Sequence, residues 1–557
     1  MTIETDTPVL IVGGGLAGLS TALFLSHRGI SCLLVERSPG LSAHPRFRGL
    51  TVRSMELYRS VGLAERIQAT GTPGGDIGGI ARVKNLAHPG AVWEKTAWED
   101  DTARLSPVDA CSCDQNRLEP ILAEDARRHG AVLWFGVELI GLDQNGDGVL
   151  ALLRERSSGA EHTVRARYVV AADGSGGPSR RLLGIGRNGP GVLGHQVSIV
   201  FEADIPPELD GRRFGACYVE DVGGALLPRD GGLWQVSVSY SPDKGERPED
   251  FTESRCLELI EAALGRAEPS ARVRVAGPWE VAAAVADRFR RGRVFLVGDA
   301  AHVMPPSGGF GGNTGIQDAH NLAWKLAEVL DGTAGPALLD TYDEERRPVA
   351  ELTLIQSLAR MPLSWLGGDG EAPPLPPQLP HNTVSLGYLY RSAALADDAS
   401  DDASDDASDD ASGRPGGPGG FGEVTVEDPR EPSGRPGSRA PHLVIETDGA
   451  RRSTLDLFGA GMTLLTGTGT AAWTVAAAEV AARHPSLRLT EWRIGPDGDV
   501  RDVEGRWPGA YGVGPDGAVL VRPDGFVGWR ARTLPDDPAG ALAAAVARCV
   551  GAEPLMA

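Results

Sequence analysis

The N-terminal residues of this chain carry the pattern of a strand, a tight glycine turn, a helix and a second strand. Val9–Val12 is a short apolar run, Gly13–Gly18 reads GGGLAG, and Ala17–His27 has the apolar spacing of a helix. A second apolar run, Ser31–Val35, ends at Glu36. This order predicts a βαβ unit with parallel strands. We therefore expect an α/β protein built on a Rossmann-like domain.

The glycine turn matches the dinucleotide fingerprint GxGxxG. Gly13 would allow the tight turn, Gly15 would let a pyrophosphate approach the backbone, and Gly18 would let the helix and strand pack closely. The helix N-terminus offers free N–H groups and the positive end of a dipole. Glu36 ends the second strand, where a carboxylate can accept hydrogen bonds from ribose hydroxyls. A glycine turn without a ligand is the alternative, but both strands, the helix and the acid favour binding.

A second glycine-rich segment lies nearly three hundred residues downstream. Asp299 follows the buried strand predicted at Val294–Val297, where it can accept a hydrogen bond from a sugar-like hydroxyl. The turn Pro306–Gly312 then leads into an amphipathic helix with Asn313 near its start. An open helix N-terminus stabilises negative charge on a bound ring. The two glycine segments together predict one extended site for an anionic, planar cofactor.

Charge and cysteine usage exclude several classes of function. The formal net charge is −21, so phosphate would be repelled and nucleic-acid binding is not expected. The six cysteines show no metal-binding spacing; Cys111 and Cys113 form the one close pair, with a redox or metal role as the lesser alternative. Scattered thiols, no signal-peptide pattern and no long apolar run predict a cytoplasmic protein without a membrane or metal partner.

The 557 residues are expected to form several domains. Residues 397–412 repeat DDAS four times, and such self-repelling charge predicts a disordered linker. Ordered patterns resume after about Arg439, with strands and helices predicted at His442–Glu446, Met462–Thr466, Ala471–Arg483, Val519–Val521 and Ala539–Val550. The predicted domains are residues 1–190 with 285–396, an inserted domain at 191–284, a linker at 397–438, and a C-terminal α/β domain at 439–557.

The inserted domain is predicted to contain an antiparallel sheet. Residues Gly232–Tyr240 alternate, with Trp234 on one side and Gln235 on the other, as in a half-buried strand. This sheet should form one wall of a substrate pocket. Trp234, Tyr218 and Phe214 are candidates to stack on a ligand, and ordinary core packing is an equal alternative for each.

The pattern GDAAHxxPPxxGxGxNxGxxDAxNLxWKL at Gly298–Leu326 resembles the FAD-binding signature of the class A flavoprotein aromatic hydroxylases. The resemblance extends from Thr7 to about Arg347 and includes Pro45-Arg46, Gln115 and Asp173-Gly174. It is strongest to hydroxylases that tailor aromatic polyketides in antibiotic biosynthesis, such as those of anthracyclines and angucyclines. In that family the C-terminal domain is thioredoxin-like but lacks the cysteines, which residues 439–557 would match.

The resemblance implies roles for individual residues. Asp173 would belong to a DG motif that serves FAD and nicotinamide binding, and Arg46 and Pro306 would lie near the flavin ring. No catalytic side chain is assigned, because the flavin carries the chemistry. The cofactor-binding residues implied are Gly13, Gly15, Leu16, Ala17, Gly18, Glu36, Arg37, Arg46, Gln115, Asp173, Asp299, Pro306, Gly311, Gly312 and Asn313. The chain departs from the family at Gly177, where Ser is usual, at Ser179, and at Phe47, where Ala is common.

The implied activity is that of an FAD-dependent monooxygenase. NADPH or NADH would reduce the flavin, and O₂ would form a C4a-hydroperoxide that hydroxylates a large aromatic substrate. Three alternatives stay open: a Baeyer–Villiger oxygenase, an FAD-dependent reductase without oxygen transfer, and a protein whose activity has decayed. The oligomeric state is also open, with a homodimer as one alternative.

Two further patterns have less weight. His302 could act as a general base, but its place in the cofactor segment favours a structural role. GTGTAA at Gly467–Ala472, with Glu491 downstream, could form a second dinucleotide site, but it lacks the third glycine. A turn in a small domain explains it better.

Overall fold

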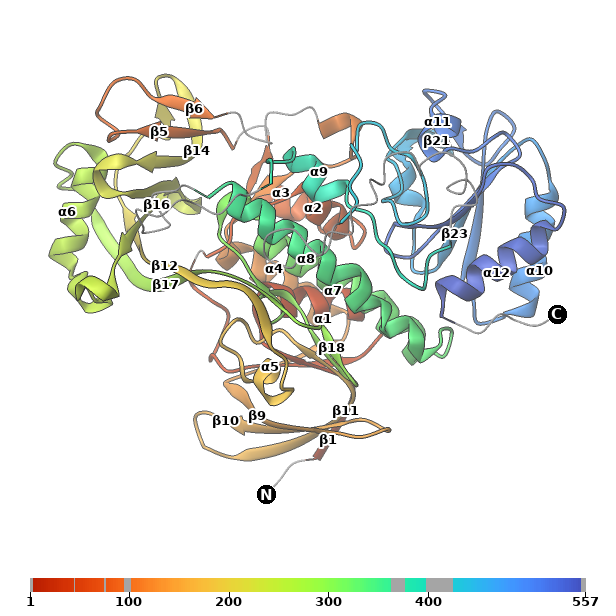
Figure 1. Ribbon diagram of the computed structural model, residues 1–557, viewed down its shortest axis with the longest axis horizontal. Coiled ribbons are helices and arrows are strands. Elements are labelled where there is room, and N and C mark those ends of the chain that lie inside the picture. Colours follow the sequence, from red (N-terminus) through yellow and green to blue (C-terminus); the bar gives the residue numbers. More distant parts are fainter. Residues whose placement is uncertain are drawn as a thin grey trace, which may run out of the picture.

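A mixed sheet forms the centre of the molecule (Figure 1). The computed structural model describes residues 4–44, 46–74, 77–94, 102–361, 376–396 and 424–551. The parallel part of this mixed sheet has the strand order β19-β11-β1-β2-β8. The strands are β1 (Glu4–Val12), β2 (Cys32–Glu36), β8 (Val132–Phe135), β11 (Glu161–Ala171) and β19 (Val294–Leu296). The predicted α/β architecture is confirmed.

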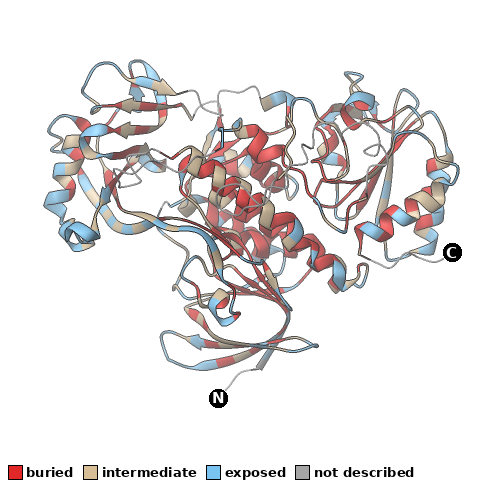
Figure 2. Cartoon of the chain, in the orientation of Figure 1, coloured by how far each residue is buried: buried red, intermediate tan, exposed pale blue. Residues whose placement is uncertain are grey.

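The helices α1 (Leu16–His27) and α4 (Gln115–Arg128) pack on this sheet, and α1 also packs against α4 and against α7 (Phe310–Leu330). The helix α8 (Thr341–Ala359) packs against α7. Figure 2 shows buried residues concentrated in these central helices and the sheet beneath them. Every residue of α7 from Asn313 to Ala327 is buried, including charged ones. A helix buried all round is expected at the centre of a large protein, where each face meets another element.

A second, mostly antiparallel sheet lies beside the first. Its order is β20-β17-β12-β16-β15-β14-β5-β6. The strands are β5 (Gly79–Val83), β6 (Val92–Glu94), β12 (Arg187–Glu202), β14 (Arg212–Val219), β15 (Gly224–Pro228), β16 (Leu233–Tyr240), β17 (Arg272–Ala286) and β20 (His302–Val303). The strands β5 and β6 belong to this sheet although they lie outside the inserted domain predicted from the sequence.

One face of the second sheet is covered by α6 (Glu253–Leu264). Phe214 and Trp234 are buried in this core, with their ring centroids 5.9 Å apart. Of the two uses considered for these aromatic residues, core packing is the one observed. The other face of the sheet remains open to a cavity.

The C-terminal unit, residues 424–551, contains a four-stranded sheet flanked by two helices (blue in Figure 1). Its order is β24-β23-β26-β27, in which β23 and β24 are parallel and the other pairs antiparallel. The elements are β23 (Met462–Gly467), β24 (Leu489–Ile494), β26 (Ala518–Val521), β27 (Val527–Ala531), α10 (Ala472–Arg483) and α12 (Pro538–Cys549).

The segment Gly387–Ala396, ahead of the DDAS repeat, hydrogen-bonds to the C-terminal unit. Leu389 N–H donates to the Thr425 carbonyl, and Tyr390 N–H donates to the Gly437 carbonyl. The repeat itself, residues 397–412, lies outside the described residues. Within the described ranges, no helix has the length and hydrophobicity needed to cross a bilayer.

Candidate active site

A cavity of about 2140 Å³ joins the two sheets. It extends from the N-terminus of α1, past the segment after β19, to the inner face of the antiparallel sheet. Typical small-molecule sites measure about 300–1,000 Å³, so this cavity has room for a cofactor and a second ligand.

Most of the predicted cofactor residues meet at this cavity. Those lining it are Gly15, Leu16, Ala17, Arg46, Gln115, Asp299, Pro306, Gly311 and Gly312. Six predicted residues are not part of the lining: Gly13, Gly18, Glu36, Arg37, Asp173 and Asn313. The two glycine segments, far apart in sequence, therefore lie at one cavity.

The three fingerprint glycines differ in what surrounds them. Gly13 has φ +108°, and a Cβ there would lie 2.2 Å from the Ala172 carbonyl oxygen. A Cβ on Gly18 would lie 1.9 Å from the Gly13 carbonyl oxygen. By contrast, a Cβ on Gly15 would meet no atom within 4 Å. The first and third glycines are thus required by packing, and the second leaves space on the cavity side.

Glu36 is fixed at the end of β2. Its two carboxylate oxygens accept hydrogen bonds from Gly14 N–H and Ser38 N–H, both at 2.7 Å. Each oxygen keeps a second lone pair for another donor. Arg37, the next residue, is exposed.

Asp299 lines the cavity directly after β19 and is exposed to it. Desolvation by the surrounding protein raises the pKa of its carboxyl, against the opposing effect of His302, Arg187 and Arg46. Arg187 also donates a hydrogen bond from Nη2 to the Asp299 carbonyl at 3.0 Å. A carboxylate near arginines is well suited to accept hydrogen bonds from hydroxyl groups.

The N-terminus of α7 opens onto the cavity at Gly311 and Gly312. The Asn313 side chain is not available to a ligand, because Oδ1 accepts from Thr51 N–H at 2.9 Å and Nδ2 donates to the Gly49 and Gly309 carbonyls at 2.7 Å. Asn313 thus fixes the start of α7. The ring of Phe47 lies over Gly312, where a Cβ would come within 2.4 Å of it.

Asp173 is directed toward α5 (Pro178–Leu182). Its Oδ2 accepts from Ser179 N–H at 2.9 Å, and burial raises the pKa of the carboxyl. A Cβ at Gly177 would lie 2.1 Å from the Asp173 Cγ. The departure from the family at Gly177 therefore permits this position of the carboxylate.

Gln115 links the cavity wall to a buried acid. Its Oε1 accepts from Phe47 N–H at 3.2 Å, and Nε2 donates to Glu119 Oε1 at 2.6 Å. Burial raises the pKa of Glu119 to about 7.

A polar network lines the inner face of the antiparallel sheet. Gln235 Nε2 donates to the hydroxyls of Ser198 and Ser237, at 2.9 and 2.8 Å. Trp279 Nε1 also donates to Ser198, at 2.9 Å. The guanidinium of Arg229 donates to Gln235 Oε1, which fixes the orientation of the amide. Alternation along β16 had placed Gln235 opposite Trp234, but the sequence did not show which side faces a cavity.

Of the three aromatic candidates, Tyr218 lines the cavity. The Arg82 guanidinium lies 4.5 Å from the centre of its ring. Trp279 also lines the cavity, and no pattern in the sequence indicates this position. Its position on β17 could have been inferred only from knowledge of the pairing with β12.

The structure lends no support to three minor hypotheses: a general base at His302, a second dinucleotide site at Gly467–Ala472, and a redox or metal role for the cysteine pair. His302 is fully buried and its Nε2 lies 2.7 Å from Asp318 Oδ2, so it does not reach the cavity. Glu491 accepts hydrogen bonds from Thr466 and Thr474, both at 3.1 Å. Burial raises the thiol pKa of Cys111 and Cys113 to about 12, so both thiols are protonated at neutral pH.

Family models match most of the chain. A family described as "FAD binding domain" matches residues 6–357, and one described as "Aromatic-ring hydroxylase, C-terminal" matches residues 433–553. A 4-methyl-5-nitrocatechol 5-monooxygenase from Burkholderia sp is 41% identical over 548 residues, covering 97% of this chain and 96% of that protein. An aklavinone 12-hydroxylase from Streptomyces purpurascens is 39% identical over 558 residues, covering 97% and 98%.

Solved structures agree with these relatives. A ternary complex of aklavinone-11 hydroxylase with FAD and aklavinone has a TM-score of 0.86 at 37% identity, covering 99% of this chain and 100% of that one. The flavin-dependent monooxygenase PieE, in complex with FAD and substrate, has a TM-score of 0.84 at 31% identity, with the same coverage. The chain therefore belongs to the class A aromatic polyketide hydroxylase family, and it is an FAD-dependent aromatic hydroxylase.

Proposed function

We propose that this protein uses NAD(P)H and O₂ to hydroxylate a large, polyketide-type aromatic substrate held beside FAD. The observation that carries the proposal is the single cavity of about 2140 Å³, which joins the glycine turns to the polar inner face of the second sheet. The names of the relatives indicate aromatic substrates of different sizes, from a nitrocatechol to aklavinone. The volume of this cavity favours the larger class.

The residues at the cofactor end fit FAD. The open space at Gly15 and the N-terminus of α1 would accept the pyrophosphate, and Glu36 would accept from the adenosine ribose. Asp299 would hold the ribityl chain, with Arg46 and Gln115 along the middle of the cofactor. The N–H groups at Gly311 and Gly312 would face the ring and stabilise negative charge on it.

Bound FAD would supply reduction by NAD(P)H, reaction with O₂ and transfer of oxygen to the substrate. The protein would orient the substrate and exclude water. The polar wall of the cavity presents the hydroxyl groups of Ser198 and Ser237, which can donate to oxygen atoms of an aromatic substrate. Gln235 and Trp279 donate to these serines and hold them in place. Arg229 fixes this wall, because its guanidinium bonds both Gln235 and, at 2.9 Å, Asp114. We also propose that the C-terminal unit is thioredoxin-like, which the strand order and directions of its sheet support.

The test is turnover by the purified yellow protein. The protein is mixed with NADPH, ¹⁸O₂ and either aklavinone or 4-methyl-5-nitrocatechol, and oxygen uptake and product mass are measured. We expect one ¹⁸O atom in the product and a higher kcat/KM for the tetracyclic compound. Flavin reduction without incorporated ¹⁸O would identify a reductase instead, and an inserted ring oxygen would identify a Baeyer–Villiger oxygenase. A preference for the nitrocatechol would contradict the substrate class.

A further inference from the structure

Asp318, on α7, is the buried partner of the segment that carries Asp299. Its Oδ2 accepts from Gly298 N–H at 3.2 Å and lies 2.7 Å from His302 Nε2. These two contacts hold both ends of the short turn between β19 and β20. Asp318 does not itself line the cavity. Its effect on a bound cofactor must therefore pass through the Gly298–His302 backbone.

Arg346, on α8, fixes Asp318 from the opposite side. Its Nε donates to Asp318 Oδ1 at 2.8 Å, and Nη2 donates to the Thr314 carbonyl at 3.2 Å. Both charged side chains are fully buried. Burial alone would raise the pKa of Asp318, but Arg346 and His302 outweigh it and keep the carboxyl ionised. A buried ion pair of this kind has few alternative arrangements, since either charge left alone would be strongly destabilised.

Tyr390 connects Arg346 to the C-terminal unit. The phenol oxygen accepts from Arg346 Nη1 at 3.1 Å, and the ring stacks on Phe526 with centroids 4.1 Å apart. Phe526 lies in the turn between β26 and β27 of the C-terminal unit. A continuous series of contacts thus leads from that turn to the segment that carries Asp299.

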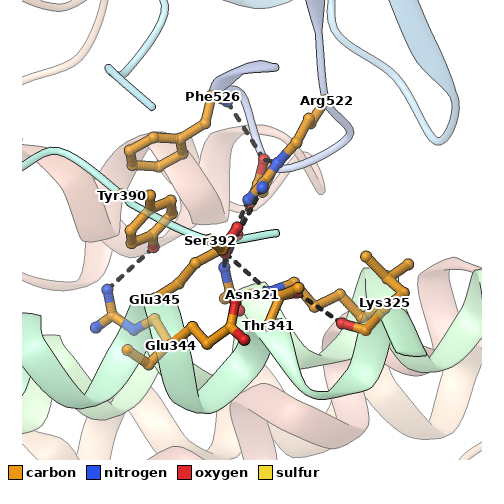
Figure 3. Close-up of polar contacts among 12 residues, drawn as sticks. Asn321, Lys325, Thr341, Glu344, Glu345, Tyr390, Ser392, Arg522 and Phe526 are labelled. Atoms are coloured by element: carbon orange, nitrogen blue, oxygen red, sulfur yellow. Dashed lines mark hydrogen bonds and ion pairs between the residues drawn. The ribbon is translucent and has the colours of Figure 1, made fainter. Parts of the chain in front are cut away.

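A second contact holds the same turn against the same helix. Arg522 donates to both carboxylate oxygens of Glu345, at 2.6 and 2.9 Å. Glu345 precedes Arg346 on α8 and also accepts from Lys325 and Asn321, each at 2.8 Å. Figure 3 shows Arg522 reaching Glu345 across the boundary, with Tyr390 and Phe526 side by side. The turn of the C-terminal unit therefore reaches α8 at two successive residues, directly at Glu345 and through Tyr390 at Arg346.

We propose that the C-terminal unit sets the position of the segment Gly298–His302, and with it the affinity for FAD, through Phe526, Tyr390, Arg346 and Asp318. Asp318 and Arg346 are positioning residues. The proposal rests on the binding of FAD at Asp299, which is part of the proposed function. Energetic coupling between two sites is reciprocal. Binding of FAD must therefore also stabilise the loop that holds Phe526.

The chain offers a matched pair of variants, Tyr390→Phe and Tyr388→Phe. Both tyrosines are buried in one aromatic cluster, stack on Phe526 and make one hydroxyl contact to a central helix. The hydroxyl of Tyr388 bonds Gln317 at 3.0 Å rather than Arg346. Each substitution removes one oxygen atom and keeps the ring. General effects on packing should therefore be the same in both.

The assay is titration of the apo-protein with FAD, followed by flavin fluorescence. We expect Tyr390→Phe to raise the Kd by about fivefold or more, the lower end of typical coupling between sites. Tyr388→Phe should keep the wild-type Kd. In the reciprocal experiment, FAD should slow amide hydrogen exchange at Arg522–Val527 in the wild type and in Tyr388→Phe, and less so in Tyr390→Phe.

The inference would be overturned by equal Kd values for Tyr390→Phe and the wild type, or by equal losses of FAD affinity in the two tyrosine variants. Asp318→Asn keeps the shape of the side chain but changes the residue that contacts Gly298 and His302 directly. It should therefore weaken FAD binding more than Tyr390→Phe does, and a smaller effect would also contradict the proposed series of contacts. If the wild type itself bound no FAD, the proposed function would fail instead, so the two failures are distinguishable.

Discussion

The single substitutions Gly15→Ala and Gly18→Ala should have different effects: the first should weaken FAD binding, and the second should destabilise the fold. A Cβ at Gly15 meets no protein atom within 4 Å, and φ there is −83°, which alanine adopts freely. Alanine is a poorer N-cap than glycine by up to about 1 kcal/mol. It also removes about 0.4–1 kcal/mol of conformational entropy from the unfolded chain. These effects offset each other, so the apo-protein of Gly15→Ala should unfold at nearly the wild-type temperature.

The same methyl group would occupy the space proposed for the pyrophosphate. Loss of two charge-assisted hydrogen bonds from the N-terminus of α1, at about 1.5 kcal/mol or more each, amounts to about 3 kcal/mol. This corresponds to roughly a hundredfold higher Kd for FAD. Titration of the apo-protein with FAD measures the effect directly.

Gly18→Ala should behave in the opposite way. Its Cβ would lie 1.9 Å from the Gly13 carbonyl oxygen, so α1 and the turn must separate. Overpacking of this kind costs about 3 kcal/mol, which lowers Tm by about 5 °C for a domain of about 300 residues. Differential scanning fluorimetry of the two apo-proteins gives the comparison. Wild-type FAD affinity in Gly15→Ala would refute the reasoning, as would a larger loss of Tm in Gly15→Ala than in Gly18→Ala.

Three other perturbations test separate parts of the molecule. Asp299→Ala should yield protein purified without FAD, and normal flavin absorbance of the purified variant would contradict the ribityl contact. Deletion of residues 397–412 should leave kcat nearly unchanged, whereas a large loss would show that the DDAS repeat is more than a spacer. Arg522 and Lys325 outweigh the effect of burial and lower the pKa of Glu345, so the wild type should lose stability as pH falls below about 4.5. Glu345→Gln should flatten this acid dependence and reduce stability at pH 7 by about 3–5 kcal/mol, as followed by urea unfolding at each pH.

The parts of the fold that the sequence predicted are those determined by local pattern. The turn at Gly13–Gly18 could be predicted because its steric requirements act between neighbours in the βαβ unit. The faces of the antiparallel sheet could not be assigned, since alternation separates Trp234 from Gln235 without showing which side meets a core. Nor could the contact between Arg522 and Glu345, which joins residues 177 positions apart through tertiary packing. The orientation of Asp173 depends on the absence of a single Cβ at Gly177.

The long strands β12 and β17 limit how the substrate range of such an enzyme can be altered. Near its start, β12 carries Arg187 beside the Asp299 backbone, and further along it presents Ser198 to the cavity. Inserting one residue between Gly194 and Ser198, where the pairing of β12 with β17 is regular, would turn the side chains that follow to the opposite face. Chimeras should therefore exchange only the chain between Glu202 and Arg272, where the paired strands end. Changes nearer the cofactor are best made by replacing individual side chains.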